Sequence, residues 1–478
     1  MGDLKSYLNK LKNKQITVIG AGVSNTPLID ALLDAGIKTT IRDKRLRTEL
    51  GEISDRFEEM GAKLKLGEDY LNGITEDVIF RTPGLMPANP EISEAVARGA
   101  VLTSEMEVFF EICPCKTIAV TGSDGKTTTT SIIAEILKND GKTVHLGGNI
   151  GTPLLCRADK MQPGDIAVIE LSSFQLITMH KSPNVAVVTN LSPNHLDVHT
   201  DMDEYINAKS NIFNHQKQTD RVVFNLDNEI TRKYATSAPA GEILFFSRHK
   251  KVKSGVFLKN GIIYEALNNE IKYVMRAEEI ILPGTHNIEN YLAAIASVLG
   301  IVSFDSIRRT AGSFCGVEHR IEFVRELRGV KYYNDSIASS PSRTIAGIGA
   351  FTALEDMKLL KDASRRVILI AGGKDKGVAF DELGMEIAAR VKALVLTGRA
   401  AELINDAVKK AIVCKPSGCP GIPEIHRCED FNEAVQKASE LAVDGDIVLL
   451  SPACTSFDRF KNFEERGNTF KDIINRLV

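Results

Sequence analysis

The chain has 478 residues, of which 43% are hydrophobic and 25% charged, a composition typical of globular proteins with hydrophobic cores. Its 59 basic and 62 acidic residues give a net charge of −3, so no overall positive field favours a nucleic-acid partner. The length predicts roughly three domains. The apolar runs are too short to predict a membrane-spanning helix, and the N-terminus lacks the apolar core of a signal peptide.

The cysteines and the charge clusters are also those expected of a globular protein and do not point to a particular function. Eight cysteines include no Cys-x-x-Cys pair, and Cys113-Pro114-Cys115 is more tightly spaced than a usual zinc pair. In a chain of this length we expect reduced, mostly buried thiols in a cytosolic protein. Short charge clusters, such as Arg42 to Arg47, are expected to be solvated.

A β-α-β unit opens the chain. Strand-like residues 16–19 lead into Gly20-Ala21-Gly22, a helical stretch runs to about Ala35, and a second strand ends at Asp43. Gly-x-Gly followed about twenty residues later by an acidic residue is typical of dinucleotide-binding folds, but Asn25 occupies the position of the third glycine. The pattern predicts a Rossmann-like domain and leaves two interpretations open, a nucleotide or phosphate ligand and a plain tight turn.

A glycine loop follows the next strongly apolar run. Residues 118–120 are strand-like, Thr121-Gly122-Ser123-Asp124-Gly125-Lys126-Thr127 follow, and a helical pattern comes next. This order predicts a phosphate-binding loop whose backbone N–H groups surround phosphate oxygens, with Lys126 supplying a charge and Thr127 a ligand for Mg2+. The loop is shorter than the usual Gly-x-x-x-x-Gly-Lys-Thr, so the alternative is a polar surface turn before a helix.

Two further blocks of strands follow. Residues 166–171 and 185–189 read as buried strands, and shorter alternating runs between about Arg221 and Ile281 predict some antiparallel structure. From Val317 onward, strands near 331–334, 366–371, 393–397 and 446–450 alternate with helical patterns. That alternation predicts a doubly wound, mainly parallel sheet.

Polar residues stand directly after several of these strands. Glu170 can reach Mg2+ at a phosphate loop, or it is a strand-end carboxylate with no role. The segment Asn194-His195-Leu196-Asp197 lies where parallel sheets bind ligands, although a lone histidine is usually structural. Lys209 has the pattern of an ordinary amphipathic-helix lysine and is not singled out by its spacing.

The last block carries three such loops. They are Asn334-Asp335-Ser336, the segment 372–377 with Lys374 and Lys376, and the segment 451–458. Gly284-Thr285-His286-Asn287 precedes a helix, where an N-cap is the plain interpretation. Three polar loops at the ends of strands in one block predict a substrate crevice, with Asp335 suited to accept hydrogen bonds from a ribose.

Taken in order, these motifs resemble those of the Mur ligases over nearly the whole chain. The matching segments are 121–127, 147–151, 170–175, 194–197, 284–287, 319–320, 334–336 and 451–454. The resemblance implies three α/β domains, each built on a mainly parallel sheet. They are a Rossmann-like UDP-sugar domain (1–112), a central ATPase domain with the phosphate loop (113–317) and a doubly wound amino-acid domain (318–478).

Within the family, the resemblance is to the branch that adds D-glutamate to UDP-N-acetylmuramoyl-L-alanine in bacterial peptidoglycan precursor synthesis in the cytoplasm. It implies that ATP phosphorylates the alanyl carboxylate and that the amine of D-glutamate attacks the resulting acyl phosphate. ATP and Mg2+, at two sites, are the implied cofactors. The implied partners are these small molecules, with no nucleic acid and no membrane, and the protein is expected to be a monomer.

The resemblance also assigns residues by their positions in the motifs. The residues that would bind ATP are Gly122, Ser123, Asp124, Gly125, Lys126, Thr127, Thr128, Asn287, Arg320 and Asp335. Those that would bind the UDP-sugar are Gly22, Ser24, Asp43, Arg45, Gly84, Asn149 and His195. Those around D-glutamate are Ser339, Lys376, Ser456, Phe457 and Phe463. Metal would be held by Thr127, Glu170, His195 and Lys209, the last after carbamylation, and Lys126, His195 and Lys209 would be catalytic.

Two positions depart from the family pattern. Ile337 stands where a lysine is common, which leaves Arg343 as a candidate replacement cation near the amino-acid site. Ser339 stands where threonine is common and keeps the hydroxyl group.

Three other kinds of protein could share parts of this pattern. A folylpolyglutamate synthetase or a ligase for a diamino acid is disfavoured by the Gly-x-Gly first domain and by the lack of an Asp-Asn-Pro-Arg-like motif. A non-enzymatic nucleotide-binding protein would not need Lys126, Glu170, His195 and Lys209 together. A GTPase would need a guanine-reading Asn-Lys-x-Asp, which the chain lacks, and a simple kinase would not need three such domains.

Overall fold

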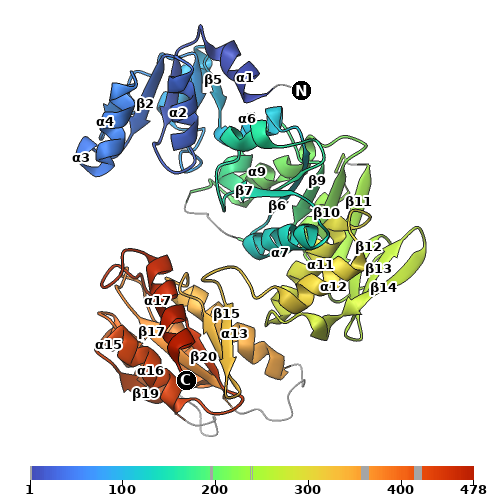
Figure 1. Ribbon diagram of the computed structural model, residues 1–478, viewed down its shortest axis with the longest axis vertical. Helices are drawn as coiled ribbons and strands as arrows, with labels where there is room; N and C mark the ends of the chain where they lie inside the picture. Colours follow the sequence, from blue (N-terminus) through green and yellow to red (C-terminus); the bar gives the residue numbers. More distant parts are fainter. Residues whose placement is uncertain (1–2, 194–197, 237, 240, 357–364, 414–421) are drawn as a thin grey trace. The chain divides into compact units, whose positions relative to one another are not determined.

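The computed structural model describes residues 3–193, 198–236, 238–239, 241–356, 365–413 and 422–478, and the statements below refer to these. By its internal contacts the chain divides into two compact units, Met1–Glu279 with Glu289–Thr310, and Ile280–Ile288 with Ala311–Val478. The first unit contains two sheets and the second contains one (Figure 1). The predicted α/β class is confirmed, while the predicted domain boundaries after residues 112 and 317 stay predictions.

The first sheet has five described strands, all parallel, in the order β3-β2-β1-β4-β5. The strands are β1 (Ile16–Ile19), β2 (Thr39–Asp43), β3 (Lys63–Leu66), β4 (Val78–Phe80) and β5 (Val101–Thr103). The helices are α1 (Leu4–Leu11), α2 (Thr26–Asp34), α3 (Arg47–Leu50), α4 (Glu52–Glu59), α5 (Pro90–Ala97) and α6 (Glu105–Ile112). The β-α-β unit predicted at the start of the chain is therefore present as β1, α2 and β2.

The second sheet has nine described strands, in the order β14-β13-β12-β11-β10-β9-β6-β8-β7. They are β6 (Lys116–Thr121), β7 (Val144–Gly148), β8 (Ile166–Glu170), β9 (Val185–Val188), β10 (Arg221–Asn225), β11 (Glu242–Ser247), β12 (Gly255–Lys259), β13 (Ile262–Leu267) and β14 (Glu270–Arg276). Only the pairs β12–β13 and β13–β14 are antiparallel in this described sheet. The antiparallel structure predicted between residues 221 and 281 is therefore confirmed at one edge.

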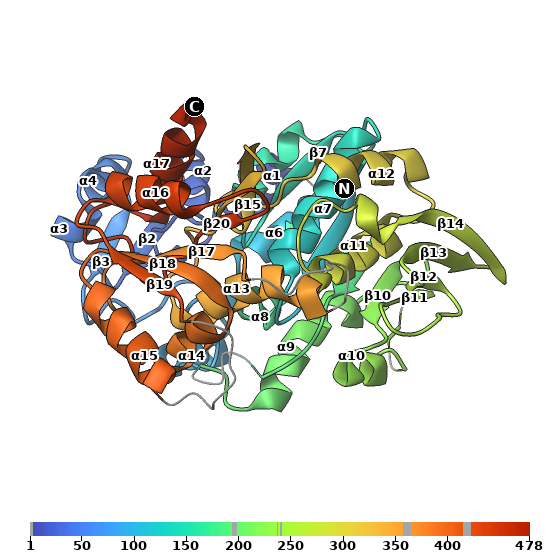
Figure 2. The same ribbon diagram turned by 90° about the horizontal axis from the view of Figure 1, so that it is seen from below.

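Helices accompany this sheet. They are α7 (Lys126–Asn139), η1 (Leu155–Lys160), α8 (Ser173–Leu176), α9 (Met202–Asn214), α10 (Glu229–Tyr234), η2 (Ala277–Glu279), α11 (Thr285–Val298) and α12 (Phe304–Ser313). In both views α7 runs beside α11 (Figure 1, Figure 2). The Thr129 hydroxyl donates to the side chain of Asn290 at 3.3 Å, which joins the two helices. The phosphate loop is thus followed by a helix that a second helix supports.

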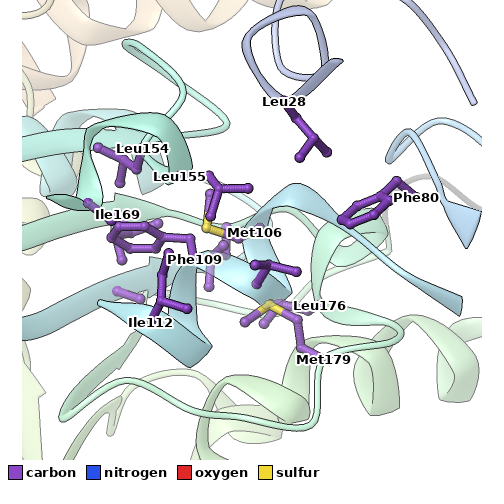
Figure 3. Packing of buried hydrophobic residues seen from close by; sticks show 14 of the residues in the cluster. Leu28, Phe80, Met106, Phe109, Ile112, Leu154, Leu155, Ile169, Leu176 and Met179 are labelled. Atoms are coloured by element: carbon purple, nitrogen blue, oxygen red, sulfur yellow. The ribbon is translucent and has the colours of Figure 1, made fainter. Parts of the chain in front are cut away.

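One hydrophobic cluster runs through both sheets of the first unit. Figure 3 shows Leu28 from α2, Phe80 at the end of β4, Phe109 from α6 and Ile169 from β8 in this cluster. Each of these side chains is fully buried. Complete burial of a side chain of this size contributes about 1.5–3 kcal/mol. The first sheet therefore shares its core with the second rather than standing apart from it.

Helix α6 is central to this shared core. Its N-cap Ser104 accepts a hydrogen bond from the backbone N–H of Glu107, and Met106, Phe109 and Ile112 recur every three residues on its buried face. Glu105, the first residue of the helix, accepts a hydrogen bond from the backbone N–H of Leu155 at 2.8 Å. Side-chain packing and this buried hydrogen bond together attach α6 to η1.

The third sheet has six described strands, in the order β15-β16-β20-β17-β18-β19, and only β15–β16 is antiparallel among them. The strands are β15 (Glu322–Leu327), β16 (Val330–Asn334), β17 (Val367–Gly372), β18 (Val391–Thr397), β19 (Glu424–Arg427) and β20 (Ile447–Leu450). The helices are α13 (Pro341–Asp356), α14 (Asp381–Arg390), α15 (Ala401–Val413), α16 (Phe431–Leu441) and α17 (Phe463–Arg476).

The two faces of the third sheet have separate cores. On β17, Leu369 packs with residues of α14 and α15, including Leu383 and Ile404. Its neighbour Ile368 packs instead with residues of α16 and α17, including Phe431. Because successive side chains of a strand point to opposite faces, this sheet is covered by helices on both sides, and the predicted doubly wound arrangement is confirmed.

The prediction that the cluster from Arg42 to Arg47 is solvated is wrong for Arg42. This side chain is fully buried, and its guanidinium lies 3.1 Å from the carboxylate of Glu76. It also donates to the hydroxyl of Thr17 and to the backbone carbonyls of Tyr70, Asn72 and Gly73. An arginine can be buried when its N–H groups and its charge find partners, and β2 supplies that position.

Of the helices in the described part of the chain, none combines the length and the apolarity that crossing a membrane requires.

The buried carboxyl of Glu105 makes the stability of the first unit dependent on pH. Burial raises the pKa of Glu105 from 4.5 to about 7, although backbone N–H groups of Leu155 and Leu154 donate to it. The folded state therefore holds the proton over a pH range in which the unfolded state releases it. Stability falls as the pH rises through this range, by at most about 3 kcal/mol from this one group.

We expect Glu105→Gln to remove this dependence, because the amide keeps a hydrogen-bond acceptor and carries no charge. The unfolding free energy of the variant, minus that of the parent protein, should rise from pH 4.5 to about 7 and then level off. Urea unfolding of both proteins across this range measures the difference. Glu107, whose pKa burial also raises to about 7, is present in both proteins and cancels. A difference that does not change with pH would contradict the prediction.

Candidate active site

The phosphate-loop motif lies between β6 and α7, as predicted. Gly122 and Gly125 both have positive φ angles, of 151° and 77°. A Cβ atom at Gly122 would lie 1.9 Å from Thr189 Oγ1, and one at Gly125 would lie 2.3 Å from Asn290 Oδ1. Neither position has room for a side chain, so the loop needs glycine at both.

Side chains from elsewhere in the first unit hold the loop. The Ser123 hydroxyl lies 2.9 Å from the Tyr205 hydroxyl and donates to the backbone carbonyl of Ser192 at 3.0 Å. The backbone N–H of Asp124 donates to the Asn190 side chain at 3.0 Å. The loop is therefore fixed by the segment that follows β9 and by Tyr205 of α9 before any ligand binds.

Helix α7 begins at Lys126, directly after the loop. The Lys126 Nζ donates to the backbone carbonyls of Gly122 at 3.0 Å and Ser123 at 2.9 Å. Thr127, half-buried, and Thr128, buried, occupy the next two positions of the helix. A glycine loop that runs into the N-terminus of a long helix, with an ammonium group above it, suits the phosphates of a nucleotide.

Glu170 ends β8, the strand next to β6. Its side chain is buried, and Asn149 donates to Oε1 at 2.8 Å. Its other oxygen, Oε2, is buried and has no hydrogen-bond partner among the described residues. A buried carboxylate oxygen without a partner is costly unless a cation or a water compensates it, and carboxylate oxygens are ligands that Mg2+ prefers.

Lys209 lies beside the same loop. Its side chain is only 3% exposed, so the amphipathic pattern of α9 was a poor guide to its environment. Its Nζ donates to the backbone carbonyl of Gly122 at 2.9 Å and to the Thr121 hydroxyl at 3.3 Å, and lies 4.8 Å from the centre of the Tyr205 ring. Burial, and then the positive charge of Lys126, hold the pKa of Lys209 well below its usual value.

The described residues do not by themselves form a conventional metal site. Among them, no three His, Cys, Asp or Glu side chains gather where they could hold an ion. Thr127 lies in the first turn of α7 and Glu170 ends β8, whereas His195, predicted as a ligand and as a catalytic residue, lies outside the described residues. The unpartnered Oε2 of Glu170 is therefore the feature that fits a cation most directly. The amine of Lys209 would fit one only after carbamylation, which converts it into a negatively charged carbamate.

His199 is a buried residue near this site that the sequence analysis did not single out. Its ring stacks on Phe174 with the centroids 5.2 Å apart, and its Nε2 lies 2.9 Å from the Ser173 hydroxyl. It thereby supports the segment that follows Glu170. Its place in the polar run that begins at Asn194 was the available signal, because such runs after buried strands often carry more than one functional side chain.

In the first sheet, the ends of β1 and β2 converge. The Asp43 carboxylate accepts hydrogen bonds from the backbone N–H of Ala21 at 2.8 Å and from the guanidinium of Arg45 at 2.7 Å. Burial tends to raise the pKa of Asp43, but the hydrogen bonds from Arg45 and Ala21 outweigh it and hold the pKa below its usual value. Gly22 and Ser24, predicted to bind the UDP-sugar, are exposed nearby on the loop before α2.

Asn25, which replaces the third glycine of the dinucleotide pattern, has a structural role in this loop. Its buried side-chain amide donates to the backbone carbonyls of Ile19 and Gly20 at 3.1 and 3.0 Å. The turn that carries the exposed Gly84 follows Arg81, whose guanidinium donates to the carbonyl of Leu85 at 3.2 Å. Both loops are thus braced by buried polar side chains.

The second unit gathers its own polar loops at the ends of β16, β17 and β20. Asp335 is buried, and its carboxylate accepts hydrogen bonds from the Ser451 hydroxyl at 2.8 Å and the backbone N–H of Ile321 at 3.3 Å. Burial raises the pKa of Asp335 to about 7 despite these bonds. Arg320, the residue before Ile321, is half-buried. Asn287 is buried at the start of α11, where its side chain donates to the carbonyl of Pro283.

Two of the predicted amino-acid loops pair with each other. The backbone N–H groups of Lys374 and Thr455 donate to each other's carbonyl groups at 2.9 and 3.1 Å. Lys376 and Phe457 are exposed, Ser456 is buried, and Ser339 is half-buried. The sequence therefore identified loops that the structure brings together.

Arg466 is a residue of this region that the sequence analysis missed. It is buried and donates to the hydroxyl and carbonyl of Ser336 and to the carbonyl of Cys454. The Ser336 hydroxyl in turn donates to the carbonyl of Phe463 at 2.7 Å. Arg466 thus ties together the strand-end segments that were predicted to surround an amino acid. Its helical position in α17 gave no signal of this role.

Comparison with known proteins places the chain in a family. The family model described as Mur ligase middle domain matches residues 120–298, and the model described as Mur ligase, glutamate ligase domain matches residues 319–454. The chain is 49% identical to the UDP-N-acetylmuramoylalanine--D-glutamate ligase of Acetivibrio thermocellus over 99% of both chains. It is 48% identical to the protein of the same name in Ruminiclostridium cellulolyticum, again over 99% of both chains.

Solved structures share the fold at low sequence identity. A UDP-N-acetylmuramate-alanine ligase from Thermotoga maritima superposes with a TM-score of 0.56 and 18% identity, covering 97% of this chain and 99% of that one. A UDP-N-acetylmuramoyl-L-alanyl-D-glutamate--2,6-diaminopimelate ligase gives a TM-score of 0.55 and 19% identity, covering 98% and 94%. These likenesses concern the fold, whereas the two family models and the full-length relatives show that the chain belongs to the Mur ligase family.

Proposed function

We propose that this chain is an ATP-dependent ligase that joins D-glutamate to UDP-N-acetylmuramoyl-L-alanine through an acyl-phosphate intermediate. The observation that carries the choice of substrates is the 49% identity, over 99% of both chains, to a relative named for this reaction. The phosphate loop, the buried Glu170 and the buried Lys209 support ATP as the source of energy. Phosphorylation converts a carboxylate, a poor electrophile, into an acyl phosphate that an amine can attack.

The residues at the loop support this chemistry by their charges. Lys126, held over the loop by two backbone carbonyls, is placed to contact the β- and γ-phosphates and to offset the negative charge that develops as the γ-phosphoryl group moves. The backbone N–H groups between Gly122 and Thr127 would bind and orient the phosphates. The loop is held by Tyr205 and Asn190 before the nucleotide binds, so little of it must reorganise on binding.

Mur ligases generally use Mg2+, and the residues of this site fit the ion. Thr127 and Glu170 would hold it, together with His195 and a carbamylated Lys209, and we propose two such ions. When bound, Mg2+ would neutralise charge on the phosphates. The unpartnered Oε2 of Glu170 is the observation that favours an ion here.

Carbamylation of Lys209 is part of the proposal. Its neutral amine would attack carbon dioxide and lose a proton, giving a carbamate with a negative charge. Burial and the positive charge of Lys126 lower the pKa of Lys209, which favours the neutral amine, the form that reacts with carbon dioxide. The product would place an anion beside Lys126, where the ammonium form of Lys209 is disfavoured by the like charge.

We also propose the binding of the two other substrates from the motif positions. Gly22, Ser24, Asp43, Arg45, Gly84 and Asn149 would contact the UDP-sugar, and Asn287, Arg320 and Asp335 the nucleotide. Ser339, Lys376, Ser456, Phe457 and Phe463 would surround D-glutamate, with Arg343 as the candidate cation in place of the lysine that Ile337 lacks. We further propose a monomeric protein in the bacterial cytoplasm, with domains 1–112, 113–317 and 318–478.

The substrates are tested by measuring phosphate release from ATP. We expect release to require both UDP-N-acetylmuramoyl-L-alanine and D-glutamate, and L-glutamate or a diamino acid to give none. Release with another amino acid, or only with a folate, would keep ATP-dependent ligation and reject the substrate assignment. No release with any combination would reject the ligase.

Lys126→Ala should lower phosphate release by roughly 100- to 1,000-fold or more, because the charge over the loop is lost. The measurement is the rate of phosphate release with all substrates present, alongside a circular dichroism spectrum to show that the fold is retained. Lys138→Ala is the matched control, since Lys138 lies on the same helix with 52% of its side chain exposed. Turnover that Lys126→Ala leaves unchanged would rule out the phosphate-loop assignment.

Lys209→Ala should be inactive and should regain part of its activity when short carboxylates such as formate or acetate are added. The added anion would occupy the space of the lost carbamate and restore a metal ligand. Phosphate release as a function of carboxylate concentration measures the rescue. Lys126→Ala should not be rescued by the same anions, and a folded Lys209→Ala protein that no carboxylate rescues would count against carbamylation.

A further inference from the structure

Three sulfur atoms lie close together at the junction between α6 and β6. Cys113 Sγ and Cys115 Sγ are 3.5 Å apart, and Cys115 Sγ is 4.0 Å from the thioether sulfur of Met161. Cys113 is the C-cap of α6, Cys115 precedes β6 directly, and Met161 follows η1. Two segments of the first unit therefore supply the three soft donors, Cys113-Pro114-Cys115 between α6 and β6 and Met161 after η1.

The three residues of this sulfur cluster differ in their exposure to solvent. Cys113 is half-buried, whereas Cys115 and Met161 are 7% and 4% exposed. The cluster thus has one accessible donor at the surface and two donors inside. Phe109, Ile112 and Met161 belong to the same hydrophobic cluster as Cys115, so the inner donors are held in place by packing.

The two cysteines are free thiols whose sulfur atoms are in contact, and the Cys113 Sγ also donates to the backbone carbonyl of Cys115 at 3.7 Å.

The sulfur spacing suits a bridging metal better than a disulfide. A metal–sulfur bond of about 2.3 Å places two ligands about 3.8–4.0 Å apart in tetrahedral or trigonal coordination. A disulfide would require the two Cys sulfurs to approach to about 2.05 Å with only a proline between the cysteines, a short ring that strains the bond and makes it easily reduced. The separations of 3.5 Å between the two thiol sulfurs and 4.0 Å between Cys115 and Met161 are close to these values.

The donor set selects the metal. Zn2+ in structural sites takes four Cys or His ligands, and among the described residues no group of three or more His, Cys, Asp or Glu side chains is placed to hold an ion. Thiolate and thioether sulfur together favour Cu(I), which accepts three sulfur ligands. The thioether of Met161 contributes nothing to a disulfide or to a zinc site of this kind, whereas it is a normal ligand of Cu(I).

We propose that Cys113, Cys115 and Met161 form a binding site for one Cu(I) ion. Binding forms metal–sulfur bonds, releases the thiol protons to solvent and involves no electron transfer, because copper enters as Cu(I). The ion would join the end of α6, the start of β6 and the residue after η1, and so stabilise the junction of the two sheets of the first unit. The proposal stands independently of the ligase reaction.

The test is a titration of the reduced, full-length protein with Cu(I) in competition with a chromogenic Cu(I) chelator. Cys414 and Cys419, which lie outside the described residues, are replaced by serine in all proteins to remove them as competitors. We expect the parent protein to withdraw one equivalent of copper. Cys113→Ser and Cys115→Ser should each weaken binding by more than the roughly 10- to 100-fold that loss of an outer-shell partner causes.

Met161→Leu tests the third ligand with little change in volume, and should weaken binding about tenfold while the unfolding temperature without metal is retained. Cys156→Ser is the control, since this half-buried thiol donates to the carbonyl of Pro27 and should leave the affinity unchanged. X-ray absorption of the copper-loaded parent should show sulfur ligands only, at about 2.3 Å. Failure of the parent protein to bind, undiminished binding by Cys113→Ser, or nitrogen or oxygen ligands in the absorption spectrum would each overturn the proposal.

Discussion

The phosphate loop depends on one shared hydrogen-bond acceptor. The backbone carbonyl of Gly122 accepts hydrogen bonds from the amines of both Lys126 and Lys209, at 3.0 and 2.9 Å. Two ammonium groups at one carbonyl repel each other, and only Lys209 is buried, so Lys209 is the one that gives up its proton most easily. Near the carboxylate of Glu170, Lys126 therefore keeps its positive charge more readily than Lys209 does. Lys209 is the amine that more easily takes the neutral, reactive form.

This arrangement is connected to the first sheet through buried polar groups rather than through surface contacts. Arg81, at the end of β4, is only 1% exposed and donates to the carbonyl of Phe174 at 2.6 Å and to that of Leu85 at 3.2 Å. Phe174 stacks on His199, which is next to Tyr205, and Tyr205 holds Ser123 in the loop. The turn with Gly84 and the phosphate loop are thus linked by a continuous series of packed residues within the first unit.

The sequence predicted what depends on local pattern and missed what depends on packing. Strand periodicity located β1, β6, β8 and β17, because their buried side chains alternate or run continuously between glycine-rich turns. Lys209 and Arg42 were misjudged, since a helical or charged pattern does not reveal that β6 or Glu76 will bury them. The metal role of Glu170 was predicted from its place at the end of a strand beside the phosphate loop, whereas the role of Lys209 came only from motif resemblance, and both remain proposals.

Two buried ionisable side chains of the second unit, Arg466 and Asp335, have a role that is better sought in positioning than in stability. Burial lowers the pKa of Arg466 to about 10 and raises that of Asp335 to about 7, so each group is costly in its charged form. Apolar side chains of similar volume would avoid this cost, but they could not donate to Ser336 and Cys454 or accept from Ser451. Those hydrogen bonds fix the loops after β16 and β20 in one arrangement. The presence of these two costly buried groups is therefore better explained by the positions they give to the strand-end loops than by any gain in stability.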